Sequence, residues 1–223
     1  MLSVTHAMHQ RRSTRRFLPM PIAQETVETL LQAARRAPSG ANLQPGFVHV
    51  LSGAPLANLC EQVCAAFDAG DRRPEAYTYF PDPMPEVLKA RQRTVGYALY
   101  NSLGIARRDL VGRKAQHRRN FTFFDAPVGL VVTIDRAMGA GCYMDLGMFL
   151  QSIFLLAEEA GLATCGIGAL ASYSHVLQRA LNLPEDQTVV CGIALGYADT
   201  TAPENQFPTE RAGLAEFARF SGF

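Results

Sequence analysis

Residues 143–161 read "YMDLGMFLQSIFLLAEEAG", a segment that is apolar on nearly every side of a helical projection. A surface helix would carry polar residues along one face, so this pattern predicts a helix that is buried on all sides. Gly161 suits the position just after the last helical turn, where a left-handed backbone is common. The most apolar part, residues 146–157, contains Gln151 and Ser152 and is shorter than the roughly 20 residues of a membrane span.

Two apolar segments flank this helix in the sequence and predict central strands. They read "PVGLVVTI" (127–134) and "TVVCGIALGY" (188–197), while "FVHVL" (47–51) alternates like a third strand. Helices are predicted over 22–37, 55–69, 86–103 and 105–118, and from Ser172, as a cap, to Leu181. "LATCGIGAL" (162–170) is predicted to be a glycine-bearing loop. Because strands and helices do not alternate regularly, we expect an α+β domain spanning residues 1–223.

The overall composition points to a cytoplasmic protein with a small ligand. The 223 residues carry a net charge of +1, whereas binders of nucleic acid or membrane surfaces usually have a more lopsided charge. No secretory signal is expected, because His6, His9 and several arginines interrupt the N-terminal segment. The odd number of cysteines has no metal-ligand spacing and predicts free thiols in a reducing cytosol. They are Cys60, Cys64, Cys142, Cys165 and Cys191.

A basic cluster, "RRSTRRF", occupies residues 11–17. Guanidinium groups bind phosphate through forked, charge-assisted hydrogen bonds, so part of this cluster could surround one phosphate monoester. The residues in question are Arg11, Arg12, Ser13 and Arg15. Arg211, in the late segment "NQFPTERAG", is a candidate to converge on the same phosphate. The alternatives are a solvated basic surface and an Arg211 that pairs with Glu210 or Glu216.

Several familiar sites have no counterpart in the sequence. There is no Walker loop and no GxGxxG motif after a strand, which argues against a dinucleotide on a Rossmann platform. None of the histidines lies in a GxSxG context or beside a carboxylate, which argues against a hydrolase. A mononucleotide such as FMN would suit the chain better. "PSGANLQPG" (38–46) offers polar groups for the sugar chain, and "TCGIG" (164–168) offers backbone N–H groups for a ring.

Five segments in order resemble the FMN-dependent nitroreductase family. They are "RRSTRRF", "RAPSGANLQP" (36–45), "MDLGMFLQSIFLLAEEAGLATC" (144–165), "LNLPEDQTVVCGIALGYAD" (181–199) and "NQFPTER" (205–211). Residues 113–136 are most similar to members that reduce nitrobenzoates and related nitroaromatics. The resemblance implies a nitroreductase-like α+β fold with a small, antiparallel-containing sheet packed by helices. It also implies a domain completed by homodimerisation, with the sites at the interface.

The same resemblance implies the site residues. Arg11, Arg12, Ser13 and Arg15, joined by Arg211, would hold the FMN phosphate and ribityl chain. Pro38, Ser39, Gly40 and Asn42 would reach the flavin of the other subunit. Gly166 and Ile167 would lie near flavin N5, and Asn120 near the pyrimidine edge. No catalytic side chain and no metal are expected. The family commonly has tryptophan where this chain has Gly46, so an aromatic wall would be lost or replaced by Phe47.

The implied activity is a ping-pong transfer of hydride from NADH or NADPH, through FMN, to a nitroaromatic compound, giving nitroso and hydroxylamine products. An enone reductase, dehalogenase or dehydrogenase on the same fold is the first alternative. A flavin- or nucleic-acid-binding module without turnover is the second, although aromatic residues are not interleaved with the arginines. In the basic stretch 86–119, Arg107, Arg108 or Arg113 could steer a substrate carboxylate, or simply form a solvated helix face.

Overall fold

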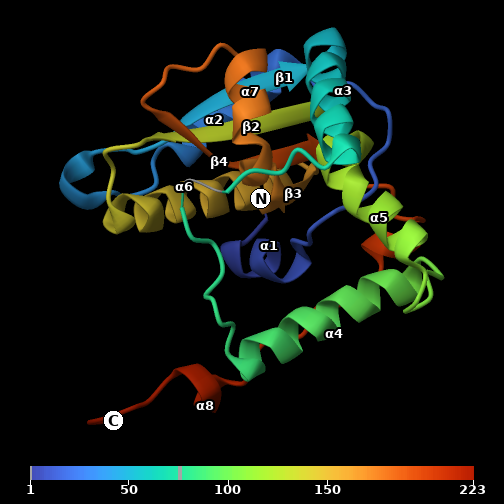
Figure 1. Ribbon diagram of the computed structural model, residues 1–223. Coiled ribbons are helices and arrows are strands. Elements are labelled where there is room, and N and C mark those ends of the chain that lie inside the picture. The colour runs from blue at the N-terminus through green and yellow to red at the C-terminus, as the bar shows by residue number, and fades with distance from the viewer. Residues whose placement is uncertain (1, 75–76) are drawn as a thin grey trace.

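A computed structural model describes residues 2–74 and 77–223 (Figure 1). Its centre is a four-stranded sheet of order β1-β2-β4-β3, in which every neighbouring pair is antiparallel. The strands are β1 (Phe47–Ser52), β2 (Val128–Asp135), β3 (Ala163–Ile167) and β4 (Gln187–Gly196). The sheet and its flanking helices confirm the predicted α+β class.

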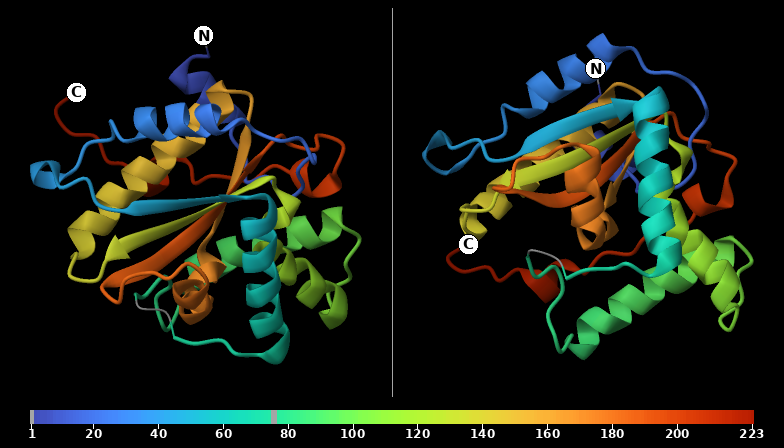
Figure 2. Two further views of the ribbon diagram at one scale, coloured as in Figure 1. Left: turned by 90° about the horizontal axis from the view of Figure 1, so that it is seen from above. Right: turned by 45° about the horizontal axis from the view of Figure 1, so that its top comes forward.

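Helices cover both faces of the sheet (Figure 2). On one face, α2 (Gln24–Ala34) and α6 (Ala140–Glu159) pack against Leu130 and Val132 of β2. On the other, α3 (Gly53–Ala69) and α7 (Ser174–Ala180) enclose a second core that contains Val131. All three β2 side chains are fully buried, because β2 is a central strand with helices on either side.

Helix α6 is buried on one face only, so the prediction of complete burial was wrong for the single chain. Leu146, Phe149 and Ile153 pack against the sheet, while Met144 and Met148 remain 71% and 41% exposed. Among the described residues, α6 is the one helix whose length and composition would allow a membrane span, a test that core helices of soluble proteins also pass. The apolar residues of α6 therefore lie on two faces, one covered by the sheet and one exposed.

The predicted loop at 162–170 contains strand β3. Ala163–Ile167 pairs with β4 in the register Thr164 to Leu195, which the local glycine signal did not reveal. The prediction that Ser172 caps α7 was wrong. Ser172 is buried within the 3₁₀ turn Gly168–Tyr173, where its hydroxyl accepts a hydrogen bond from Arg72 Nε at 3.2 Å. Pairing and burial supplied by distant segments override both local signals.

Two helix N-termini depend on local caps. Helix α1 (Val4–Gln10) was not predicted, and it begins where the Ser3 hydroxyl accepts the His6 N–H at 3.2 Å. Helix α5 (Leu110–Arg118) starts later than expected because Asp109 Oδ1 accepts the Gly112 N–H at 2.8 Å.

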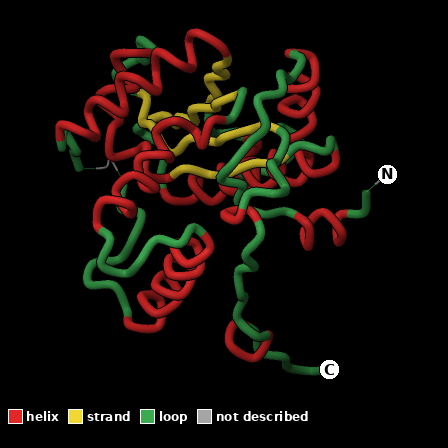
Figure 3. The backbone as a smooth tube through the Cα atoms, turned by 90° about the vertical axis from the view of Figure 1, so that its right-hand side faces the viewer, coloured by secondary structure: helices red, strands yellow, loops and turns green. Residues whose placement is uncertain are grey.

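Helix α4 (Glu86–Ser102) lies apart from the sheet, and none of its residues is buried (Figures 1 and 3). The chain after Phe207 also runs away from the sheet and ends in the short helix α8 (Leu214–Phe217). An ion pair between Arg91 and Glu216, 3.1 Å long, joins the two outlying parts.

Candidate active site

The arginine-rich segment crosses the ends of two strands. The Thr14 N–H donates to Thr164 O of β3 at 2.9 Å, and the Leu18 N–H donates to Tyr197 O, just beyond β4, at 2.8 Å. Phe17 is buried between these contacts and anchors the segment in the core. The backbone of residues 13–18 is therefore held by the sheet, while the arginine side chains are left outside the core.

These side chains line a cavity of about 970 Å³. The predicted phosphate-binding residues all reach it, although almost 200 residues separate the two ends of the set. They are Arg11, Arg12, Ser13, Arg15 and Arg211. Helix α4 forms an opposite wall with small and apolar side chains, among them Ala90, Thr94 and Val95. One chain thus supplies both a basic wall and a weakly polar wall of this cavity.

Five arginines of the described chain line the cavity, and only Arg91 among them has an ion-pair partner, Glu216. In residues 2–74 and 77–223, no ion pair is formed by Arg11, Arg12, Arg15 or Arg211. Arg15 and Arg211 donate only to nearby oxygens, Ser13 O at 3.2 Å and Thr209 Oγ1 at 2.8 Å. Guanidinium groups that face one cavity without ion pairs of their own favour binding of an anion with several acceptor oxygens.

Strand β3 connects the cavity with the predicted flavin-edge residues. The arginine segment pairs with Thr164, and Gly166 lies two residues further along the strand, about 7 Å away at the usual strand rise. Gly166 is exposed, whereas the neighbouring Ile167 is buried. Cys165 lies between Thr164 and Gly166. Burial raises the pKa of its thiol, whereas the positive charges of Arg15 and Arg11 lower it to a smaller extent. Cys165 is therefore a protonated thiol at neutral pH and unsuited to act as a nucleophile.

The other predicted contacts lie elsewhere in the chain. Pro38, Ser39, Gly40 and Asn42 do not line the arginine cavity. Their loop is fixed instead against α6, where the Gly40 N–H donates to Asp145 Oδ2 at 3.0 Å. Asn120 is also outside the cavity, and its Nδ2 donates to His117 O at 2.7 Å. A single chain therefore brings together the phosphate-binding set but not the residues assigned to the partner's flavin.

Residues 8–197 match the sequence model of the nitroreductase family. The chain belongs to the nitroreductase family. One relative is the nitrobenzene nitroreductase of Ectopseudomonas oleovorans, which is 38% identical over 214 residues, or 96% of this chain and 94% of the relative. Another is the 4-nitrobenzoate reductase of Pseudomonas putida, 36% identical over 213 residues, or 96% and 93% of the two chains.

A solved member of the nitroreductase family has nearly the same backbone. The FMN and NADPH-dependent nitroreductase NfnB from Sphigopyxis sp. strain HMH is 38% identical and superposes with a TM-score of 0.96 over the whole of both chains. The family resemblance and the nitroreductase-like fold, both predicted from sequence, are confirmed.

The loop before β1 has an unusual backbone. Three residues that are not glycine have positive φ, namely Ala41 (49°), Asn42 (58°) and Gln44 (50°). Such conformations cost free energy and persist where surrounding contacts hold them. The Arg35 guanidinium supplies several of these contacts, donating to the carbonyl oxygens of Gln44, Pro45 and Gly46 at 2.9–3.2 Å and lying over the Phe149 ring at 4.2 Å.

Gly46, where the resemblance to the family implies tryptophan, has a backbone conformation that favours glycine. Its φ is +93°, and a Cβ at this position would lie 2.4 Å from Leu146 Cδ1. A side chain here would be strained by the positive φ and would have to displace the end of the Leu146 side chain, so this loop conformation favours glycine. Phe47 follows it on β1 with 60% exposure, and its ring packs on His49 at 4.8 Å.

Replacing Gly46 with alanine is expected to lower the free energy of unfolding by about 2 kcal/mol or more, since the strained φ and the overlap with buried Leu146 both oppose the new methyl group. Urea denaturation followed by circular dichroism measures the change. Gly141→Ala is the matched control, because Gly141 lies in the first turn of α6 with nothing within 4 Å of an added Cβ. Equal stability of the two variants would contradict the expectation.

Sequence reasoning missed two residues of this nitroreductase-family site. Glu204 and Asn205 belong to the 3₁₀ turn Pro203–Asn205 and line the same cavity as Arg15. The segment "NQFPTER" drew attention to Arg211 alone. The Asn205 amide bonds to the backbone of Arg15, 190 positions away, and the Glu204 carboxylate bonds to the Arg119 side chain, 85 positions away. No local pattern marks either partner, so only the fold reveals them.

Proposed function

We propose that this chain is an FMN-dependent NAD(P)H oxidoreductase that reduces nitroaromatic compounds to nitroso and hydroxylamine products. The observation that carries the proposal is the cavity of about 970 Å³, where four arginines without ion pairs face one space. The relatives named above support the same reaction class, since two are called nitrobenzene and 4-nitrobenzoate reductases and a third is FMN and NADPH-dependent.

The residues of the cavity fit the charge and size of FMN. Arg11, Arg12, Arg15 and Arg211 would bind the phosphate, with the Ser13 hydroxyl as a further partner for the phosphate or ribityl chain. Gly166 and Ile167, on the adjoining part of β3, would face the ring near N5. The contact of Asn120 with the pyrimidine edge stays a prediction, because Asn120 lies outside the cavity and its Nδ2 donates to His117 O. When bound, FMN supplies the redox chemistry, and the protein supplies binding, orientation and electrostatics.

No side chain of the cavity is proposed as a nucleophile or a metal ligand. Burial raises the pKa of Cys191 to about 12, and it also raises the pKa of Cys165, so neither thiol ionises at neutral pH. No group of potential metal ligands occurs in the described part of the chain. All five cysteines are free, which supports the proposed cytoplasmic location.

We propose that the protein is a homodimer with both sites at the interface. The open face of α6 and several further apolar side chains lack cover in the single chain, and exposed apolar surface of this extent marks interaction sites. These side chains include Val4, Met8, Met144, Phe217, Phe220 and Phe223. A second copy would also bring Pro38, Ser39, Gly40 and Asn42 to a flavin that their own chain does not offer them.

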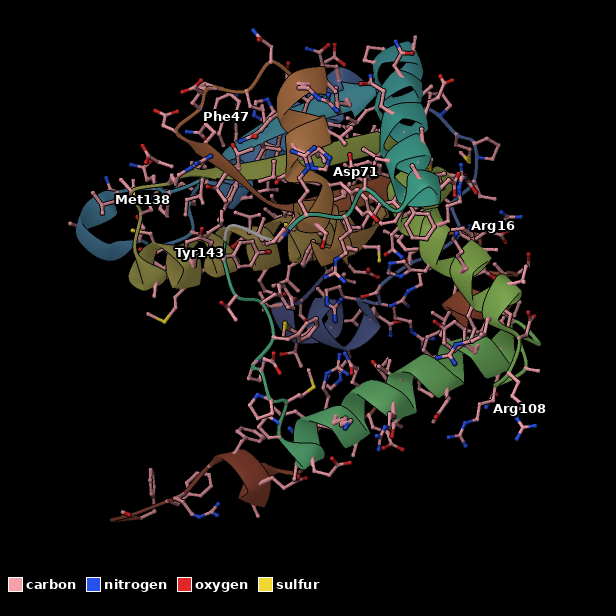
Figure 4. The ribbon with its side chains drawn as sticks, viewed as in Figure 1. Arg16, Phe47, Asp71, Arg108, Met138 and Tyr143 are labelled. Carbon is pink, nitrogen blue, oxygen red and sulfur yellow. The ribbon has the colours of Figure 1, made fainter. Side chains whose placement is uncertain are left out.

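The basic helices give little support to carboxylate steering. Arg113 donates to Arg107 O at 3.2 Å and lies over the Tyr100 ring at 4.6 Å, a contact that stabilises the α4–α5 connection. Arg108 extends into solvent beyond that connection (Figure 4). None of the three arginines lines the cavity. A role for them in substrate attraction stays a prediction.

The visible spectrum of the purified protein tests the proposed function. We expect a yellow protein with flavin absorption, bleached by NADPH or NADH under nitrogen and restored by nitrobenzene or 4-nitrobenzoate. Restoration by an enone or a halogenated arene, but by no nitroarene, would favour the alternative flavoenzymes of the same fold. A colourless protein that takes up no added FMN would contradict the proposal.

A further inference from the structure

The side chain of Asn205 bonds to three backbone groups, in two segments of the chain, at the edge of the cavity. Its Oδ1 accepts the Arg15 N–H at 2.7 Å, and its Nδ2 donates to Arg16 O and to Asp199 O, each at 2.8 Å. An asparagine amide offers an acceptor and two donors at fixed angles, so one residue can satisfy all three groups.

These hydrogen bonds hold a part of the arginine segment that no strand pairs with. The arginine segment bridges to Thr164 at Ser13 and to Ala198 at Phe17, and these are its only bridges to the sheet within the described residues. Arg15 lies midway between them, and its N–H is bound by no backbone carbonyl there. Asn205 supplies the partner at this point and so sets the direction in which the Arg15 side chain leaves the backbone.

The residue before Asn205 forms an ion pair that is largely buried. Glu204, only 5% exposed, accepts from Arg119 Nη1 at 2.7 Å through its Oε1. This contact ties the turn Pro203–Asn205 to residues 119–125, on the far side of the arginine segment. It also neutralises a carboxylate that lines the cavity and would otherwise repel an anion.

We infer that Asn205 is a positioning residue of the phosphate site, acting on FMN through the backbone of Arg15 and Arg16. The inference rests on the proposed function, because it takes the phosphate of FMN as the anion that Arg15 binds. Asn205 then contributes to binding of the phosphate without contributing charge. Its effect is specific to flavins that carry a phosphate, whereas a residue that merely supported folding would affect all flavins alike.

The experiment compares FMN with riboflavin, which has the same ring and ribityl chain but no phosphate. The full-length protein is freed of flavin, and the dissociation constant of each flavin is measured by quenching of flavin fluorescence. The variant is Asn205→Ala. The matched control is Gln206→Ala, because Gln206 is the next amide in the chain and donates to Thr200 O at 3.0 Å, but makes no contact with the arginine segment.

We expect Asn205→Ala to weaken FMN binding about tenfold or more while riboflavin binding changes less than about twofold, because a misdirected guanidinium loses its aligned hydrogen bonds. Gln206→Ala should preserve the preference of the wild type for FMN. Should Asn205→Ala fail to fold, Asn205→Ser keeps a small polar side chain there, and the same loss of preference is expected.

Two results overturn the inference in different ways. A wild-type protein that binds riboflavin as tightly as FMN has no phosphate site, so the proposed function and the inference fail together. A wild-type protein that prefers FMN, with Asn205 variants that keep the full preference, leaves the proposed function intact and refutes the role of Asn205 alone.

Discussion

Replacing Arg15 with alanine is expected to raise the dissociation constant of FMN by about ten- to one hundredfold, which corresponds to the loss of roughly 1.5–3 kcal/mol for a hydrogen bond to a charged group. Arg15 lines the cavity without an ion-pair partner, so its charge is available to the ligand. The measurement is a fluorescence titration of the flavin-free protein with FMN.

The neighbouring residue provides a matched control for this change. Arg16 does not line the cavity, and its Nη1 lies 3.4 Å from Asp125 Oδ2 in an exposed ion pair. Arg16→Ala removes the same charge one position along the chain and should change FMN affinity by less than about threefold, since exposed ion pairs contribute little. Equal losses for the two variants would mean that general positive charge, and not the Arg15 side chain, holds the phosphate.

Arg119→Ala is expected to lower the free energy of unfolding by about 3–5 kcal/mol, because removing one partner of a buried ion pair leaves the other charge unpaired in the interior. The side chains of Arg119 and Glu204 are 20% and 6% exposed, and their closest N and O atoms are 2.7 Å apart. The variant also loses a weaker contact of 3.4 Å to Asp125. Chemical denaturation of the flavin-free protein measures the change.

The preceding arginine gives the comparison. Arg118 pairs with Asp68 at 3.0 Å, but their side chains are 40% and 49% exposed. An exposed pair typically contributes up to about 1 kcal/mol, so Arg118→Ala should be nearly neutral. If the two variants were equally stable, the Glu204 pair would not hold the turn that carries Asn205.

Elements governed by their own sequence were predicted well. The strands expected at 127–134 and 188–197 correspond to β2 and β4, because continuous apolar runs between turn residues mark strands that are covered on both faces. The long helix at 143–161 corresponds to α6. That residues 1–223 form one domain stays a prediction.

Elements that depend on distant partners were missed or misjudged. Strand β3 exists because it pairs with β4, and Thr164 gives no local sign of that pairing. The burial of α6 was overestimated because apolar composition does not reveal whether the covering surface belongs to the same chain. Asn205 was missed for a similar reason, since its importance lies in contacts made by folding.

The predicted phosphate-binding residues show what a sequence can indicate about a site. A cluster of arginines around Ser13 suggested an anion, and the structure brings Arg211 to the same cavity. The placement of Gly40 and Asn120 outside this cavity was not evident from the sequence, because each depends on how loops dock onto other elements. Binding of FMN by these residues stays a prediction.

In the proposed homodimer, the uncovered side of α6 links folding to concentration. A helix that rests on its own sheet through Phe149 and presents Met144 to water leaves part of its hydrophobic free energy to be gained only in association. Two copies that share such a surface resist unfolding more strongly as their number per volume rises, by mass action. Dilution would then weaken the protein and its ligand site in the same step, so the abundance of the chain in the cell becomes a determinant of how much working enzyme it holds.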